Sequence, residues 1–129
     1  KKINLTKLPW GNLGMTICYD LRFPLLYKKL AKKGAHFFSI PAAFTYTTGI
    51  SHWESLLRAR AIENGCFVFA PAQCGYHDNG RRTFGNSMII DPWGKILKRA
   101  KNSIGSISCE IDLEKVNFYR KRIPAMTEY

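Results

Sequence analysis

Short apolar runs alternate with helical segments over the first 72 residues of the chain. The apolar runs, residues 13–18, 36–40 and 66–72, have the length and composition of buried strands. Residues 23–33 are predicted to form a helix, because leucines recur there at helical spacing, a proline stands in the first turn and glycine follows the last residue. Residues 51–64 are predicted to form a second helix, which is also followed by glycine.

The pattern changes in the second half of the chain. Residues 73–83 are polar and contain glycine, which predicts a surface loop, as it does for residues 41–49. Residues 86–90 and 95–99 are two strand-like runs on either side of the sequence DPWG, in which proline and glycine favour a tight turn. These two runs are therefore predicted to form a hairpin.

Residues 104–111 are predicted to form a further strand, and Asp112 is predicted to cap a last helix that ends near Arg122. Helices between the early strands and hairpins between the later ones predict an α/β fold with a mixed sheet. The 129 residues are enough for one compact domain, and no repeat or linker divides them.

The chain is strongly basic, with 20 Lys and Arg against 9 Asp and Glu and a net charge of +11. Such an excess fits either a polyanionic partner or a solvated basic surface. The basic residues are scattered and form no single stripe with interleaved aromatic residues, so we expect a solvated surface and no nucleic-acid partner. No apolar run reaches the length of about 20 residues that crosses a membrane, so we expect no membrane partner.

Four cysteines, Cys18, Cys66, Cys74 and Cys109, occur without any C-x-x-C spacing. Three of them lie in or beside apolar runs, which predicts reduced thiols in a cytoplasmic compartment. Cys74 and His77 are too few to hold a metal ion, so no metal or cofactor is expected.

Cys18 stands where an apolar strand ends and a helix begins, in the sequence ICYDLRFP. The helix dipole and Arg22 would both favour a thiolate there, and the backbone N–H of Tyr19 could donate to an oxyanion. Asp20 could pair with Arg22 and hold the turn. The alternative is a buried core cysteine beside a structural Asp–Arg pair.

Glu54 also has two interpretations. Ser51 and Glu54 have the S-x-x-E spacing of a capping box, in which the carboxylate only stabilises the helix start. The functional alternative is a carboxylate that positions a catalytic cation. His52 could serve as a base for Cys18, although a lone histidine at a helix start is more often a surface or capping residue.

Six segments together resemble the nitrilase superfamily of carbon–nitrogen hydrolases. In chain order they are GMTICYDLRFP, GAHFFSIPAAF, TGISHWESLLRARAIEN, APAQCG, FGNSMIIDPWG and EIDLEKVNFYRKRIP, and they span nearly the whole chain. The similarity is greatest to the Nit branch of the superfamily. Asn86 stands where the Gly-His-Ser pattern of that branch has its histidine.

The resemblance implies a fold, a reaction and a set of site residues. The fold is the C-terminal part of a four-layer α-β-β-α sandwich, usually assembled into oligomers. The reaction is attack of a cysteine thiolate on a small linear amide, with a thioester intermediate and release of ammonia. By position, Cys18 resembles the nucleophile, Tyr19 contributes its N–H to the oxyanion hole, and Glu54 resembles a glutamate near the catalytic lysine.

The resemblance also implies where the substrate binds and what it is. The expected pocket residues follow the strand after the nucleophile: Pro41, Ala42, Ala43, Phe44 and Thr48. The Nit branch includes amidases that act on deaminated glutathione, and the related ω-amidases are the alternative.

The family's glutamate base and lysine precede its cysteine by greater distances than this chain provides. Only seventeen residues come before Cys18, and they include no Asp or Glu. We therefore interpret residues 1–129 as a partial carbon–nitrogen hydrolase domain without its N-terminal half, inactive unless another chain supplies that half. The alternative is a catalytically dead remnant or interaction module. The expected partners are a small-molecule amide and either further copies of the chain, as a homo-oligomer, or the N-terminal half on another chain.

Overall fold

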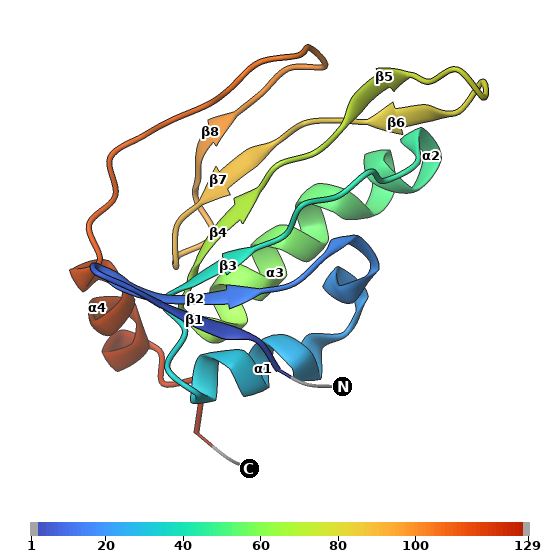
Figure 1. Ribbon diagram of the computed structural model, residues 1–129. Coiled ribbons are helices and arrows are strands. Elements are labelled where there is room, and N and C mark those ends of the chain that lie inside the picture. The colour runs from blue at the N-terminus through green and yellow to red at the C-terminus, as the bar shows by residue number, and fades with distance from the viewer. Residues whose placement is uncertain (1–2, 128–129) are drawn as a thin grey trace.

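The computed structural model describes residues 3–127, which form a six-stranded sheet, a two-stranded sheet and several helices (Figure 1). The strands are β1 (Leu5–Leu8), β2 (Gly11–Met15), β3 (Phe37–Ser39), β4 (Phe67–Ala70), β5 (Cys74–Tyr76), β6 (Arg82–Phe84), β7 (Met88–Ile90) and β8 (Ile96–Arg99). The helices are a 3₁₀ helix (Cys18–Arg22), α1 (Pro24–Lys32), α2 (Tyr46–Thr48), a π-helical turn (Gly49–Trp53), α3 (Glu54–Asn64) and α4 (Glu114–Arg122).

The large sheet has the strand order β1-β2-β3-β4-β7-β8. Strands β2, β3 and β4 are parallel, because helices connect each of them to the next. Strands β1, β7 and β8 pair antiparallel with their neighbours. Short turns join β1 to β2 and β7 to β8, whereas residues 71–87, which include β5 and β6, connect β4 to β7. The prediction of an α/β fold with a mixed sheet is confirmed.

Alternate residues of the strands face two different layers. On one face, Phe38, Val68 and Ile90 are fully buried in the main core. Helices α1 and α3 cover this face of the sheet (Figure 1). On the other face, Phe37 and Phe67 are buried against Val116 of α4. This period of two explains why the strands carry apolar residues at nearly every position.

The segment of residues 104–111 was predicted to be a strand, and this prediction is wrong. Its inward residues, Ile107, Cys109 and Ile111, alternate with exposed ones, as in a strand. Within residues 3–127, however, no strand pairs with this segment, which crosses the sheet face that bears Phe67. An extended chain without a hydrogen-bonded neighbour is not a strand.

The prediction of a surface loop over residues 73–83 is also wrong. Strands β5 and β6 form a hairpin there, with Cys74 paired to Phe84 and Tyr76 to Arg82. The edge strand β1 was not predicted, because its LTKL sequence is too short and polar to stand out. Asp112 does accept a hydrogen bond from Glu114 N–H at 3.0 Å, at the start of α4.

The predicted capping box at Ser51 does not form. The helical path begins earlier, at Tyr46, and passes through the π-helical turn into α3 without a side-chain cap. Gly49 lies in that turn so close to Phe84 that a methyl group there would collide with the ring. None of the helices within residues 3–127 has both the length and the apolar character needed to cross a bilayer.

Cys66 makes the stability of this fold sensitive to alkaline pH. Burial raises the pKa of the Cys66 thiol to about 11 from an ordinary 9.0, although Arg120 opposes the shift from 3.1 Å away. Between these values the thiol ionises in the unfolded chain and stays protonated in the folded one. We therefore expect the free energy of unfolding to fall by about 1.4 kcal/mol per pH unit from about pH 9 to about pH 11.

Urea unfolding at half-unit steps of pH measures this slope, with Cys66→Ser as the matched variant because serine does not titrate. The variant should lose the slope between pH 9 and 10. Some slope should remain above pH 10, because burial also raises the pKa of Tyr27. A variant with the same slope as the parent from pH 9 to 10 would contradict the assignment to Cys66.

Candidate active site

The carboxyl ends of β2, β3 and β4 meet at one edge of the sheet, because these strands are parallel (Figure 1). Cys18 follows β2, Pro41 follows β3 and Pro71 follows β4. The Cys18 N–H donates to the Pro41 carbonyl at 2.8 Å, and the Ala42 N–H donates to the Pro71 carbonyl at 3.0 Å. The thiol therefore lies at the edge where open α/β sheets bind their ligands.

Cys18 occupies a sharp and strained turn. Its backbone φ is +44°, in the left-handed region that residues other than glycine seldom adopt. The turn is closed by two hydrogen bonds between Ile17 and Asp20: the Ile17 N–H donates to the Asp20 carboxylate at 3.1 Å, and the Asp20 N–H donates to the Ile17 carbonyl at 2.9 Å. In the α/β-hydrolase fold, a strained strand-to-helix turn presents a nucleophilic serine.

Arg60 of α3 is hydrogen-bonded to the turn that carries Cys18. It is 5% exposed, and its Nε and Nη2 atoms donate to the Leu21 carbonyl at 3.1 and 2.8 Å. A third bond runs from Nη1 to Glu63 at 2.8 Å. Because Leu21 and Cys18 belong to the same 3₁₀ helix, α3 fixes the position of the thiol.

The predicted pair between Asp20 and Arg22 does not form. Asp20 accepts from Ile17, as described, whereas the Arg22 guanidinium donates to His52 Nδ1 at 3.3 Å and lies 5.2 Å from the centre of the Phe44 ring. This hydrogen bond occupies the ring nitrogen of His52, and His52 does not line the cavity at Cys18. His52 therefore helps to hold the turn through its contact with Arg22.

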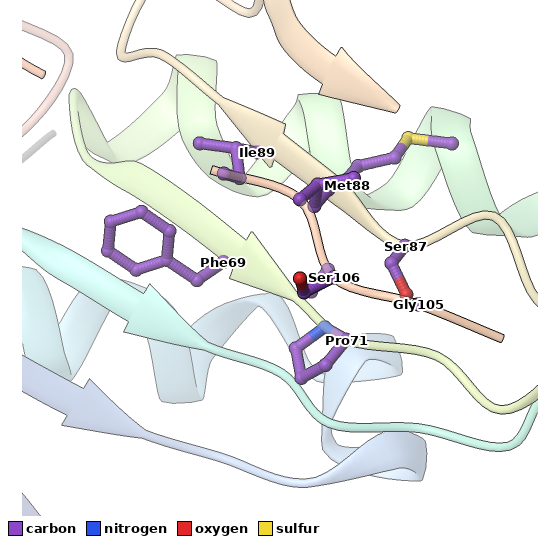
Figure 2. Close-up of a pocket in the computed structure, with 9 residues that line it drawn as sticks. Phe69, Pro71, Ser87, Met88, Ile89, Gly105 and Ser106 are labelled. Carbon is purple, nitrogen blue, oxygen red and sulfur yellow. The ribbon is translucent and has the colours of Figure 1, made fainter. Parts of the chain in front are cut away.

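The Cys18 thiol opens into a cavity of about 520 Å³. Its lining consists of small, apolar and amide side chains: Ile17, Cys18, Pro41, Ala42, Ala43, Pro71, Ala72, Gln73, Ser87 and Gly105. Figure 2 shows a neighbouring recess of about 340 Å³, which shares Pro71, Ser87 and Gly105 with it. Within the described part of the chain, no acidic or basic side chain lines the Cys18 cavity, so these walls offer space and shape but no proton acceptor.

The predicted substrate-binding residues divide into two groups. Pro41, Ala42 and Ala43 line the cavity. Phe44 does not line the cavity. It is 7% exposed and packs on Trp53, with ring centres 4.9 Å apart. Thr48 is not among the lining residues, and its hydroxyl is hydrogen-bonded to that of Thr45 at 2.7 Å.

Glu54 is also placed away from the cavity lining. Its carboxylate pairs with Arg99 at 2.6 Å, and Arg99 also donates to the Asn86 side chain at 3.2 Å. Trp53 donates to the Asn86 carbonyl at 2.9 Å, so Asn86 joins the π-helical turn to β8. Asn86 itself has a φ of +60°, a conformation that asparagine tolerates better than most residues.

Tyr19 follows Cys18 in the turn, but it is not among the residues that line the cavity, and its side chain is exposed. Its N–H lies in the first turn of the 3₁₀ helix, where backbone donors have no partner within the helix. No other residue within 3–127 accepts a hydrogen bond from it. The donor next to the Cys18 thiol is therefore free to bind a developing negative charge.

Sequence reasoning missed Gln73 and Ser87, which line the same cavity. Ser87 accepts a hydrogen bond from the Ala72 N–H at 2.8 Å and so joins the ends of β4 and β7. The available signal for Gln73 was that it is the first polar residue after the buried strand β4, three positions beyond Ala70. Three or more His, Cys, Asp or Glu side chains converge nowhere within residues 3–127 in a way that would hold a metal ion.

The sequence matches one protein family over most of its length. The model of the carbon-nitrogen hydrolase family matches residues 1–121. The chain belongs to this family.

Individual relatives give a finer comparison. The chain is 50% identical over 117 residues to a deaminated glutathione amidase of Synechocystis, which covers 91% of this chain and 43% of that protein. The solved structure of the NitFhit protein of C. elegans has a TM-score of 0.86 at 48% identity, over 88% of this chain and 28% of that one. Nit3 of Saccharomyces cerevisiae, a nitrilase-superfamily structure, has a TM-score of 0.90 at 34% identity, over 96% and 46%. The chain thus spans less than half of these relatives, and the predicted membership of the nitrilase superfamily is confirmed.

Proposed function

We propose that this chain carries the nucleophile and part of the oxyanion hole of an amidase. The observation that supports the proposal is the position of Cys18, a strained residue at the carboxyl edge of the sheet with its thiol in a cavity. A cysteine that only fills a core does not need a left-handed backbone, and Cys66 shows what such a residue looks like in the same molecule. Cys66 is fully buried and donates to the Ala35 carbonyl at 3.3 Å.

The proposed reaction has two stages. The Cys18 thiolate adds to the amide carbon, and the negative charge on the carbonyl oxygen is held by the Tyr19 N–H. The carbon–nitrogen bond then breaks, the nitrogen leaves with a proton as an amine or ammonia, and a thioester remains. Water adds to the thioester carbon, the carbon–sulfur bond breaks, and the acid and the thiol are released.

Each stage requires groups that move protons, and the described cavity lining has none. We propose that the general base and a lysine are supplied from outside these 129 residues, either by more of the same polypeptide or by another chain. Without a positioned base, acylation is expected to be slower by about 10²–10⁴-fold. The proposed partner therefore supplies the base and the lysine that act with Cys18. Glu54 has a structural role in this proposal, because it acts with Arg99 to hold Asn86 and the start of α3.

The surface around Cys18 supports a covering partner. Met15, Ile17 and Tyr19 are 49%, 65% and 66% exposed on the strand and turn that carry the thiol. Large apolar side chains grouped at one edge usually mark an interaction surface. We propose that the missing catalytic groups or a second copy of the chain cover this edge.

We propose deaminated glutathione as the substrate, because relatives that are 50% and 48% identical to this chain are named deaminated glutathione amidases. This compound has a carboxylate at each end and an internal amide, whose nitrogen belongs to a dipeptide. Its hydrolysis therefore releases an amine, whereas an ω-amide of a keto acid would release ammonia. The two candidate substrates are distinguished by measuring the nitrogen product.

Thiol labelling tests the nucleophile directly. We expect iodoacetamide to alkylate Cys18 at least about tenfold faster than the buried Cys66, measured peptide by peptide with mass spectrometry. Urea-unfolded protein is the control in which all four thiols should react alike. Equal, slow reaction of Cys18 and Cys66 in the folded chain would favour a non-catalytic interaction module.

Complementation tests the chemistry. The chain is mixed with the segment that precedes the matching region in the Synechocystis relative, and hydrolysis of deaminated glutathione is followed by amine release. We expect activity only in the mixture, its loss with Cys18→Ala, and its retention with the matched variant Cys109→Ala. A mixture that forms a stable complex without hydrolysis would reject the amidase proposal, and hydrolysis that survives Cys18→Ala would reject the nucleophile.

A further inference from the structure

We infer that a polar recess beside the Cys18 cavity binds a carboxylate of the substrate, an inference that rests on the proposed function. The recess has a volume of about 150 Å³. Its lining residues are Ala43, Gln73, His77, Asn79, Arg81 and Thr83. Ala43 and Gln73 line both this recess and the Cys18 cavity, so the two are adjoining parts of one depression.

Arg81 gives the recess its charge. Its guanidinium makes no hydrogen bond or ion pair with any other residue within 3–127, although its backbone is fully engaged. No acidic side chain lines the recess, and the one acid of the same turn, Asp78, is not among the lining residues. A positive charge thus lies at the wall of a small depression without a counter-ion from the described chain.

The neighbouring Arg82 also lacks a hydrogen-bonded or ion-paired partner among residues 3–127, but aromatic rings hold its guanidinium in place. The Arg82 guanidinium stacks on the Tyr46 ring, 3.5 Å from its centre, and lies 5.4 Å from the Tyr76 ring. Successive residues of a strand face opposite sides, so Arg82 points away from the side that carries Thr83 and Arg81. One arginine holds the hairpin on α2, and the other is left for a ligand.

The turn that carries Arg81 is held in place by its own hydrogen bonds. The His77 N–H donates to the Arg81 carbonyl at 2.8 Å, and the Gly80 N–H donates to the His77 carbonyl at 2.8 Å. The Asn79 side chain accepts from the Arg81 N–H at 3.0 Å, and His77 Nε2 lies 2.8 Å from the Thr83 hydroxyl. The recess is therefore formed before a ligand arrives, which reduces the entropy lost on binding.

The chemistry of the walls favours a carboxylate. A guanidinium offers a planar pair of donors that matches the two oxygens of a carboxylate, and the Gln73 amide can add a further donor. The volume suits a carboxylate with a carbon or two, while the amide bond lies in the adjoining cavity at Cys18. The proposed site selects linear amides with an anionic end over neutral amides of the same length.

Paired alkylating reagents test this without requiring turnover. N-(iodoacetyl)glycine and N-(iodoacetyl)glycinamide differ only in a terminal carboxylate or amide, and a second pair built on 4-aminobutyrate is longer. In each case the Cys18 thiolate displaces iodide from the same carbon. For each pair we divide the alkylation rate of the acid reagent by that of the amide reagent. We expect this ratio to be higher at Cys18 than at Cys109 in one of the pairs. In Arg81→Ala the ratio at Cys18 should fall about five- to tenfold.

Two further variants sharpen the result. Arg81→Lys should retain part of the selectivity because the charge remains, and Lys98→Ala should leave the ratio unchanged because that exposed charge lies on β8. An equal ratio in the parent and Arg81→Ala at both lengths would overturn the inference. Because iodide displacement needs no general base, the inference can hold if the chain never hydrolyses an amide, and can fail while hydrolysis is observed.

Discussion

Replacing Trp53 with alanine is expected to lower the free energy of unfolding by about 4 kcal/mol, a large part of the stability of a domain of this size. Trp53 is fully buried and is the largest side chain in the main core. It packs on Phe44, and its Nε1 donates to the Asn86 carbonyl. The substitution both leaves a cavity and removes the partner of a backbone carbonyl.

Urea unfolding followed by circular dichroism measures the change. The matched variant Trp53→Phe keeps an aromatic ring and loses the hydrogen bond, so it should lose about 1–3 kcal/mol. The difference between the two variants separates packing from hydrogen bonding. A loss below about 1 kcal/mol for Trp53→Ala would mean that the π-helical turn is not packed as described.

Arg60→Ala is expected to lower the free energy of unfolding by about 3 kcal/mol, because the Leu21 carbonyl would lose both of its donors from Arg60 in the interior. Loss of the Arg60–Glu63 ion pair should add little to this decrease in the free energy of unfolding, since the Glu63 side chain is 37% exposed. The same change should loosen the turn at Cys18. We therefore expect slower selective alkylation of Cys18 under conditions where the variant remains folded.

Arg58→Ala is the matched control, because Arg58 lies on the same helix and donates one hydrogen bond to the Gly94 carbonyl at 2.9 Å. It should lose about 1 kcal/mol and leave alkylation of Cys18 unchanged. If both variants lose equal stability and Cys18 reacts alike in both, Arg60 does not support the turn.

The parts of the fold that could be predicted from sequence are those governed by local pattern. The runs around Phe38 and Val68 are apolar throughout, as strands buried on both faces must be, and the helix before Gly34 has clear end signals. The hairpin of β5 and β6 escaped prediction because its strands, CGY and RTF, are three residues long and contain no apolar run. Their pairing rather than their composition makes them strands. Residues 104–111 gave the opposite result, because apolar alternation was present but a pairing strand was not.

The site shows the same division. Cys18 could be singled out because the turn that presents it is continuous in sequence. Gln73 and Ser87 could not, because they reach the cavity from the ends of other strands. Glu54 was interpreted from its neighbour at Ser51, whereas its actual partner, Arg99, lies 45 residues away.

The left-handed backbone at Cys18 has a consequence for how this chain changes over generations. A residue other than glycine in that conformation is disfavoured by about 1 kcal/mol or more, so glycine at this position would relax the turn. Mutational drift that is filtered only for folding would therefore tend to remove the thiol. Descendants that keep cysteine at this turn would be those in which the reactivity of the thiol still contributes to fitness. Retention of Cys18 would therefore indicate selection for thiol chemistry.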